Sequence, residues 1–446
     1  MGRARYKQVV DAVAADIRTG RLKPGTRLPT HRRLAQAHGL SLATASRAYA
    51  ELQAMGLVIG ETGRGTFVRD TSYPREMDID LRQASGRSID LNFNYPAVPG
   101  QTPQLRDALR RLAAAGDLEA ALHYQPHGER VHERAIVARH LRARQLTVGA
   151  EQVAIVDGAQ HGLAVTLMAL LRPGEVVAVD ALTYPGFRVL AEMLGLELVP
   201  LPLGPQGTDP DALAALCRRR AVKALSTMPT LHNPLGHVMG ERARRRIASI
   251  ARAHDLLLIE DGAYAYLEPD PPPPLAALAP ERTVYVSSLS KSVATGLRFG
   301  FVAGAPEAVH KIERAIRATT SNTPGVITSL ACAWIEDGTV ARLEGQKRRD
   351  ARRRQAIARK ALAGLPVVAH PNAYILWLPL GEDSRADRVA AALAAQGIAV
   401  ATAEPFATTR HVPQALRLAL GSVDPETLKR ALLQVRQVVE LDGLQG

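Results

Sequence analysis

The sequence predicts an α/β protein with a small, basic helical domain ahead of its main sheet. Three observations lead to this prediction. Residues 1–70 hold twelve Lys and Arg against five Asp and Glu, so +7 of the total net charge of +13 falls in this short segment. The same segment shows three helical patterns followed by a hairpin pattern. From residue 152 onward, short apolar runs alternate with helical stretches, which is typical of a largely parallel sheet covered by helices.

The N-terminal segment is predicted to fold as a winged helix-turn-helix. Apolar side chains recur at helical spacing in three stretches, residues 6–19, 31–37 and 42–55. Thr30 and Ser41 stand where the caps of the second and third helices are expected. Two apolar runs flank the glycine-rich residues 60–65, which predicts a β-hairpin. A dense basic segment of this kind suits DNA, although a merely solvated basic surface has the same composition.

The main domain contains seven short apolar runs that predict buried strands. They lie at residues 153–156, 176–179, 196–200, 223–227, 256–260, 284–286 and 299–303. A basic helical segment follows them, and then strand-like runs that predict a smaller α+β lobe. The resulting boundaries are 1–70 for the winged helix-turn-helix, 71–90 for a linker and 91–446 for the main domain, whose small lobe begins at about residue 340.

Composition excludes several classes of protein. Cys217 and Cys332 are too few for a disulfide framework and show no metal-ligand spacing, so we expect no metal site. No run of 18 apolar residues is present, and the N-terminus leads into an amphipathic stretch. We therefore expect a cytoplasmic protein without a membrane span.

The basic domain resembles the GntR family of winged-helix regulators. The resemblance rests on the segments at 28–35, 40–49 and 63–68, which follow one another in the family's order. It implies that the third helix reads double-stranded DNA in the major groove. The implied DNA-binding residues are Arg32, Ser41, Thr44, Arg47 and, at the tip of the wing, Arg64. Leu42 departs from the family pattern because many relatives carry Arg there, so a base-reading contact is either missing or replaced by an apolar contact to a thymine methyl.

A serine-flanked lysine is the strongest motif of the main domain. Residues 287–292 read Ser-Ser-Leu-Ser-Lys-Ser, and residues 296–300 read Gly-Leu-Arg-Phe-Gly. This pattern resembles the lysine signature of fold-type I aminotransferases, which use pyridoxal 5′-phosphate (PLP). The resemblance implies that Lys291 forms an internal aldimine with PLP and that Ser288, Ser290 and Arg298 surround its phosphate.

Further motifs of the same fold appear at the expected order and distance. The resemblance assigns the phosphate to Gly158, Ala159 and Gln160 at a helix start, the ring face to Tyr184, the phenolic oxygen to Asn233 and Tyr264, and the pyridine nitrogen to Asp261. Lys291, Asp261 and Tyr184 form the implied catalytic set. A buried carboxylate at position 261 keeps the ring nitrogen protonated and makes the ring an electron sink.

Two more residues complete the implied site. Arg417 lies in a strand-like run and is implied to grip a substrate α-carboxylate. Tyr124 belongs to a loop that resembles the segment reaching the phosphate of a neighbouring subunit. His232 departs from the pattern, because relatives often show Gln before the Asn-Pro pair.

The fused pair of domains resembles the MocR subfamily of GntR regulators over nearly the whole chain. The resemblance implies a homodimer that binds operator DNA and senses an amino compound, or PLP itself, through aldimine exchange at Lys291. Two alternatives stay open. One is a functional aminotransferase with a DNA-binding appendage, and the other is a PLP-sensing repressor of vitamin B6 genes without an amine effector.

Overall fold

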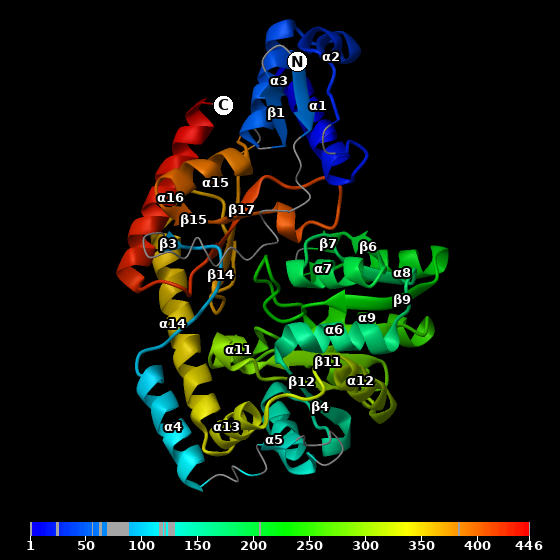
Figure 1. Cartoon of the computed structure of the whole chain (residues 1–446), viewed down its shortest axis with the longest axis vertical. Coiled ribbons are helices and arrows are strands. Elements are labelled where there is room, and N and C mark those ends of the chain that lie inside the picture. Colours follow the sequence, from blue (N-terminus) through cyan, green and yellow to red (C-terminus); the bar gives the residue numbers. More distant parts are fainter. Residues whose placement is uncertain are drawn as a thin grey trace.

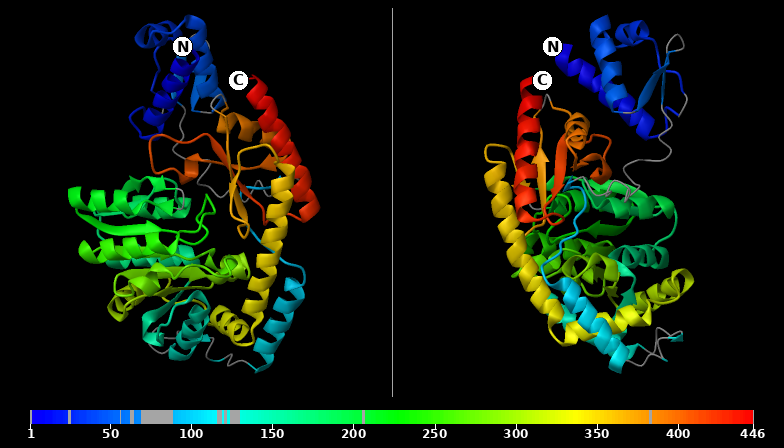
Figure 2. Two further views of the ribbon diagram at one scale, coloured as in Figure 1. Left: turned by 180° about the vertical axis from the view of Figure 1, so that it is seen from behind. Right: turned by 60° about the vertical axis from the view of Figure 1, so that its left-hand side comes forward.

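The computed structural model describes residues 2–23, 26–55, 57–61, 65–68, 89–115, 119, 122–123, 130–204, 207–381 and 384–445. These residues form three bodies that follow one another along the long axis of the molecule (Figure 1). We call them the head (residues 2–68), the small lobe (residues 89–91 and 339–445) and the large domain between them in sequence. The small lobe lies between the head and the large domain in space (Figures 1 and 2).

The head is a winged helix-turn-helix, as predicted. Its elements are α1 (Gly2–Arg18), α2 (His31–His38), α3 (Leu42–Ala54), β1 (Val58–Glu61) and β2 (Gly65–Val68). Thr30 and Ser41 accept hydrogen bonds from the N–H groups of Arg33 and Thr44, so both predicted caps are present. Val10 and Leu52 are fully enclosed in the head's own core, and burying side chains of this size stabilises the domain by about 2 kcal/mol each.

A seven-stranded sheet forms the centre of the large domain. Its strands, in spatial order, are β4 (Val153–Val156), β12 (Gly300–Ala303), β11 (Thr283–Ser288), β10 (Leu257–Asp261), β9 (Val222–Thr227), β5 (Val176–Asp180) and β6 (Glu197–Leu201). Each predicted run overlaps one of these strands. All neighbours are parallel except β12, which is antiparallel to β11 and β4. The mostly parallel fold-type I sheet is thereby confirmed.

Helices cover both faces of this sheet (Figure 1). One face packs against α6 (Gly158–Leu170), α7 (Pro185–Met193) and α12 (Pro306–Thr319). The opposite face packs against α5 (Val131–Leu141), α8 (Pro210–Arg219), α9 (Glu241–Ala253), α10 (Leu275–Leu278) and α13 (Gly325–Glu336). Because both faces are covered, the strands are apolar on both sides, which explains why they appear as continuous apolar runs.

The small lobe contains a four-stranded sheet and three long helices. The sheet order is β13 (Val368–Ala369), β14 (Ile375–Pro379), β17 (Ala415–Ala419) and β16 (Ala401–Thr402), and the helices are α14 (Thr339–Ala361), α15 (Ala386–Ala395) and α16 (Pro425–Gln445). In Figure 1, α14 runs from beside α16 down to α13 in the large domain. This helix therefore joins the two bodies.

One segment differs from the predicted organisation. The predicted linker includes residues 89 and 90, but these residues form β3 (Ile89–Asp90), which pairs in parallel with β15 (Ile398–Ala399). Leu91 follows and is fully buried in the core of the small lobe. Ile89 and Leu91 are apolar at strand spacing, and this pair is too short to stand out against the polar residues before it. Most of the predicted linker lies outside the described residues.

The remaining elements are short or lie at the edge of the large domain. They are α4 (Gln101–Ala115), α11 (Leu289–Ser292), β7 (Leu203–Gly204), β8 (Gly207–Thr208) and the 3₁₀ turns at Arg142–Arg144, Ala150–Gln152, Ala265–Leu267, Thr295–Leu297 and Glu404–Phe406. None of the described helices combines the length and apolar character needed to cross a membrane. Within the described residues, no group of three or more His, Cys, Asp or Glu side chains is arranged to hold a metal ion.

Candidate cofactor site and DNA-binding face

Lys291 lies in α11, directly after the central strand β11. Its Nζ donates a hydrogen bond to the carbonyl of Asn94 at 2.8 Å and lies 5.6 Å from the centre of the Tyr95 ring. The carbonyl of Lys291 accepts hydrogen bonds from the Tyr266 hydroxyl at 2.8 Å and from the Lys347 ammonium at 3.0 Å. The backbone of Lys291 is therefore fixed from two sides, while its amine points toward the segment that follows β3.

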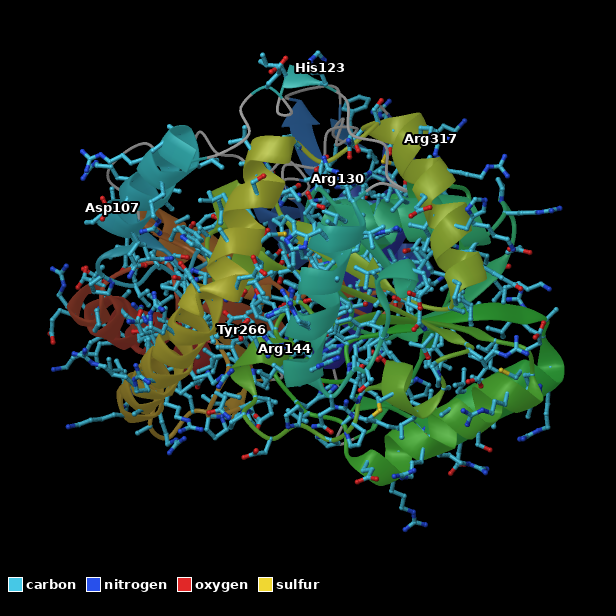
Figure 3. The ribbon with its side chains drawn as sticks, turned by 90° about the horizontal axis from the view of Figure 1, so that it is seen from below. Asp107, His123, Arg130, Arg144, Tyr266 and Arg317 are labelled. Atoms are coloured by element: carbon cyan, nitrogen blue, oxygen red, sulfur yellow. The ribbon has the colours of Figure 1, made fainter. Side chains whose placement is uncertain are left out.

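Tyr266, which binds the Lys291 carbonyl, is itself surrounded by buried side chains. Tyr266 and Arg144 lie beside each other near α14 (Figure 3). Arg144 forms a buried ion pair with Glu344 of α14, with 2.5 Å between Nη2 and Oε1. A buried pair with both partners in place fixes the relative position of its elements, since breaking it would leave a charge uncompensated.

The start of α6 forms an anion cradle. Gly158 has a φ of +82°, and a Cβ atom on Gly300 would lie 2.6 Å from the carbonyl carbon of Gly158, so both positions require glycine. Asp157 caps this helix without a side-chain hydrogen bond to it. The Arg298 guanidinium donates to the carbonyl of Asp157 at 3.0 Å. A helix N-terminus beside an arginine attracts a phosphate dianion.

The serines of the lysine motif lie beside this cradle. Ser288 accepts a hydrogen bond from the N–H of Ser290 at 3.3 Å. The hydroxyl of Ser290 is buried, and so is the carboxamide oxygen of Gln160; among the described residues neither atom has a partner. The Gln160 amide nitrogen donates to the carbonyl of Gly186 at 3.0 Å, which fixes the start of α7 against the start of α6.

A carboxylate and two phenols surround the place expected for the ring. Asp261 ends β10 and accepts a hydrogen bond from the N–H of Ala263 at 2.8 Å. Burial raises the pKa of Asp261 to about 6, while nearby His232 opposes the shift. Burial, with Asp261 and Tyr264 nearby, raises the pKa of Tyr184 to about 12, so its phenol stays neutral.

Orphaned polar atoms test whether the residues fit PLP. Among the described residues, the carboxamide oxygens of Asn233 and Asn94 and the Nε of Arg417 are buried without a hydrogen-bond partner. An unsatisfied buried polar group costs about 1–3 kcal/mol, so such a group normally faces a polar ligand. Together with the anion cradle, the amine of Lys291 and the carboxylate of Asp261, these donors and acceptors match the phosphate, aldehyde, phenolic and pyridine groups of PLP.

Arg417 occupies the middle of β17, opposite Trp377 of β14 and Ala401 of β16. Its guanidinium lies 5.1 Å from the centre of the Phe406 ring. Burial lowers the pKa of Arg417, while Tyr264 and Asp90 counteract the shift. Tyr264 also receives a hydrogen bond from the side chain of Asn94 at 3.4 Å. Arg417 is thus linked to Lys291 through Tyr264 and Asn94.

Sequence reasoning missed several neighbours of the site. Asn94, Tyr95, Tyr266 and Lys347 all contact Lys291 or its backbone. Lys347 offered a signal, because it continues the apolar stripe of Val340 and Leu343 at helical spacing and thus stands on the buried face of a basic helix. The predicted residue Tyr124 lies outside the described residues.

The start of α3 forms the exposed face of the head. The hydroxyls of Ser41 and Thr44 lie 2.7 Å apart, so both groups take part in the helix cap. Leu42 is 49% exposed, as an apolar contact to a base would require. The Arg47 guanidinium lies over the ring of Tyr6, 5.0 Å from its centre. Arg32 is exposed on α2, and the predicted wing residue Arg64 lies outside the described residues.

The fold and the pocket define a PLP-binding domain of the aminotransferase type, and the head is a DNA-binding domain joined to it in one chain. The chain belongs to the aminotransferase class I and II family, whose model matches residues 87–435. Residues 5–68 match the model of the bacterial regulatory proteins of the gntR family. These two matches confirm the resemblance on which the predicted organisation rests.

Relatives that match nearly the whole chain are named as transcriptional regulators. The uncharacterized HTH-type transcriptional regulator YdeF of Bacillus subtilis is 28% identical over 98% of this chain and 94% of its own. The HTH-type pyridoxine biosynthesis transcriptional regulator PdxR of Corynebacterium glutamicum is 28% identical over 97% of this chain and 96% of its own. Among solved structures, an archaeal alanine:glyoxylate aminotransferase superposes with a TM-score of 0.76 at 22% identity, covering 81% of this chain and 93% of its own.

Proposed function

We propose that the protein is a transcription regulator that binds operator DNA with its head and senses an amino compound, or PLP itself, in its main domain. One observation carries the proposal: a single chain holds both an exposed recognition-helix start and a pocket arranged for PLP. The names of the full-length relatives support a regulatory role. A DNA-binding head adds nothing to the transfer of an amino group between small molecules, whereas a regulator needs both parts.

Each part of the pocket has a proposed task. Arg298 and the first turn of α6 bind the phosphate, and Asp261 binds the protonated ring nitrogen. PLP supplies, when bound, an aldehyde that amines attack and a ring that withdraws electrons. Tyr184 covers the ring face, and Arg417 orients an amine that carries a carboxylate. Lys291 would hold PLP through its aldehyde, and its Nζ donates to the carbonyl of Asn94 in this structure.

The regulatory step requires two states with different affinities for effector and DNA. Asn94 lies three residues after Leu91 of the small lobe, and the next residue, Tyr95, donates its N–H to Ser422 of that lobe at 3.0 Å, whereas Lys291 lies in the large domain. A ligand that replaces this contact therefore acts on the boundary between the two bodies. A coupling of about 5- to 150-fold in operator affinity is usual for such linkage. We further propose a homodimer in which Tyr124 contributes to the phosphate site of the neighbouring subunit.

A specific observation also favours the enzyme alternative. Asn94 and Tyr264 link Lys291 to the buried Arg417, and together with Asp261 these are the groups that transamination of an amino acid requires. The vitamin B6 alternative draws on the name of one relative, a regulator of pyridoxine biosynthesis. In that alternative, PLP itself would be the effector.

Two paired measurements separate these functions. One measures the affinity of the full-length protein for DNA from its own upstream region, with and without PLP and each common amino acid. The other measures turnover of the same amino acids with 2-oxoglutarate. We expect operator affinity to respond to at least one compound while turnover stays slow. Brisk turnover, together with operator affinity that ignores every amine and PLP, would replace the regulator with the enzyme.

A further inference from the structure

Arg385 is the residue that joins the head to the small lobe. It stands at the N-cap of α15, and its side chain is 5% exposed. Its Nη1 lies 2.7 Å from the carboxylate of Asp11 in α1, and its Nε lies 3.2 Å from the carboxylate of Glu51 in α3. Its Nη2 also contacts the Met55 sulfur at 3.3 Å. One guanidinium of the small lobe thus contacts three side chains of the head, and its Nε also lies 3.7 Å from the carboxylate of Asp387 in α15.

The charge of the head makes this arrangement unusual. The head is strongly basic, with twelve Lys and Arg and five Asp and Glu in residues 1–70. Two of those five acidic residues, Asp11 and Glu51, face Arg385. The acidic side of the head therefore faces the small lobe. Figure 2 shows the head against this end of the lobe, near α15 and away from the large domain.

A short chain of contacts connects Arg385 to the cofactor pocket. The side-chain oxygen of Gln414 accepts a hydrogen bond from the N–H of Ala386 at 2.8 Å, and so holds the first turn of α15. Gln414 directly precedes β17, the strand that carries Arg417. A displacement of β17 at the pocket is therefore passed to α15 through one hydrogen bond and a few residues of backbone.

A second chain of contacts connects Arg385 to the DNA-binding face. Glu51 interacts with the Tyr6 hydroxyl, and the Arg47 guanidinium lies over the ring of the same tyrosine. Arg47 and Glu51 are four residues apart on α3, a spacing at which opposite charges attract on a helix surface. While Arg385 neutralises Glu51, Arg47 is available to DNA. Without Arg385, Glu51 would compete with DNA for Arg47.

We propose that Arg385 couples the cofactor site to the DNA-binding head. In this proposal, a change at the cofactor site makes or breaks the contacts of Arg385 with Asp11 and Glu51. This inference rests on the proposed regulatory function. It goes beyond that function because it assigns the coupling to one contact between α15 and the head.

The test compares Arg385→Gln with Glu51→Gln, the double variant and a matched control. Arg436→Gln is the control, because Arg436 forms an ion pair within α16 of the same lobe, with Glu440. We expect Arg385→Gln to leave the visible absorbance of bound PLP unchanged and to weaken basal operator affinity by about twofold, the size of a helical ion pair. Adding Glu51→Gln should restore that affinity. The ratio of operator affinities with and without an active amine should fall to near one in Arg385→Gln and keep its wild-type value in Arg436→Gln.

Docking is measured separately by amide hydrogen exchange of the full-length protein. Peptides from α1 and α3 should exchange faster in Arg385→Gln than in the wild type or in Arg436→Gln, because the head loses its anchor. If hydrogen exchange in Arg385→Gln is unchanged, or if its amine response is as large as that of the wild type, Arg385 does not couple the two sites. A wild-type protein that ignores every amine and PLP would instead remove the proposed function, and the coupling with it, while the exchange result would still decide whether Arg385 anchors the head.

Discussion

At the scale of single residues, burial sets the charge states on which the pocket depends. Asp261 is enclosed at the end of β10, where burial raises its pKa to about 6. A protonated pyridine nitrogen pairs with the ionised carboxylate, so bound PLP favours the form that burial disfavours. The free protein must therefore lose a proton from Asp261 when it binds PLP below pH 6.

This linkage gives a pH prediction for cofactor binding. Above pH 6 the Asp261 carboxylate is already ionised and contributes fully to the affinity for PLP. Below pH 6 its contribution to that affinity falls by up to about tenfold per pH unit. Asp261→Asn should bind PLP more weakly at pH 8 and lose this pH step. The ionisations of free PLP are the same in both titrations and cancel in the ratio of the two dissociation constants. A ratio that stays constant from pH 5 to 8 would contradict the assignment of Asp261.

Lys347 presents the opposite case, a buried cation beside the cofactor lysine. It donates to the carbonyls of Lys291 and Val293, at 3.0 and 2.7 Å. Burial, reinforced by Lys291, lowers its pKa to about 7, while Glu344 and Asp350 oppose the shift. Between pH 7 and 10.5 the unfolded chain binds more protons than the native protein at this position, so stability contributed by this residue rises with pH.

We therefore predict that Lys347→Met changes the pH dependence of unfolding. Relative to the variant, the wild type should gain on the order of 3 kcal/mol in unfolding free energy between pH 7 and 10. Denaturation at several pH values checks this. Lys360→Met, an exposed lysine on the same helix, serves as the control and should show no such gain. Parallel curves for the wild type and Lys347→Met would show that Lys347 does not titrate in this range.

At the scale of elements, features formed by neighbouring residues can be predicted from the sequence, whereas contacts between residues far apart in the sequence cannot. The seven strands were predictable because strands buried on both faces are apolar throughout. The cradle at Gly158, the lysine motif and Asp261 were predictable because each lies where a strand meets a helix or loop. Asn94 and Lys347 were not, since they reach Lys291 from about 200 and 56 residues away. No local pattern records such tertiary contacts.

The recognition helix α3 supports a prediction at this scale. Arg47 lies on the exposed side of α3, close to its N-terminus, and the proposed role is a phosphate or base contact. If it contacts phosphate, Arg47→Ala should reduce the slope of log affinity against log salt by about 1 and weaken binding to all sequences alike. If it reads a base, specific binding should lose about 1–3 kcal/mol while non-specific binding changes little. An unchanged affinity and slope would remove Arg47 from the interface.

At the scale of the whole molecule, β17 lies close to the boundaries between the three bodies. Arg417 in this strand is near Tyr264 of the large domain, the strand itself belongs to the small lobe, and Gln414 before it holds the start of α15 near the head. A ligand that engages Arg417 therefore acts on an element close to both boundaries. The proposed effector class follows from this position, because the guanidinium selects amines that also carry a carboxylate.

The last prediction separates recognition of the carboxylate from recognition of the cofactor. Arg417→Ala should abolish or strongly weaken the operator response to amino acids, with a loss of roughly tenfold or more in apparent effector affinity, because a buried charge-assisted pair is removed. The response to PLP should persist, since the groups proposed to bind its phosphate, Arg298 and the start of α6, are unchanged. Titration of operator affinity with an active amino acid, with the corresponding amine lacking the carboxylate, and with PLP measures all three. Equal losses for the amino acid and the plain amine would show that Arg417 supports the pocket without binding the carboxylate.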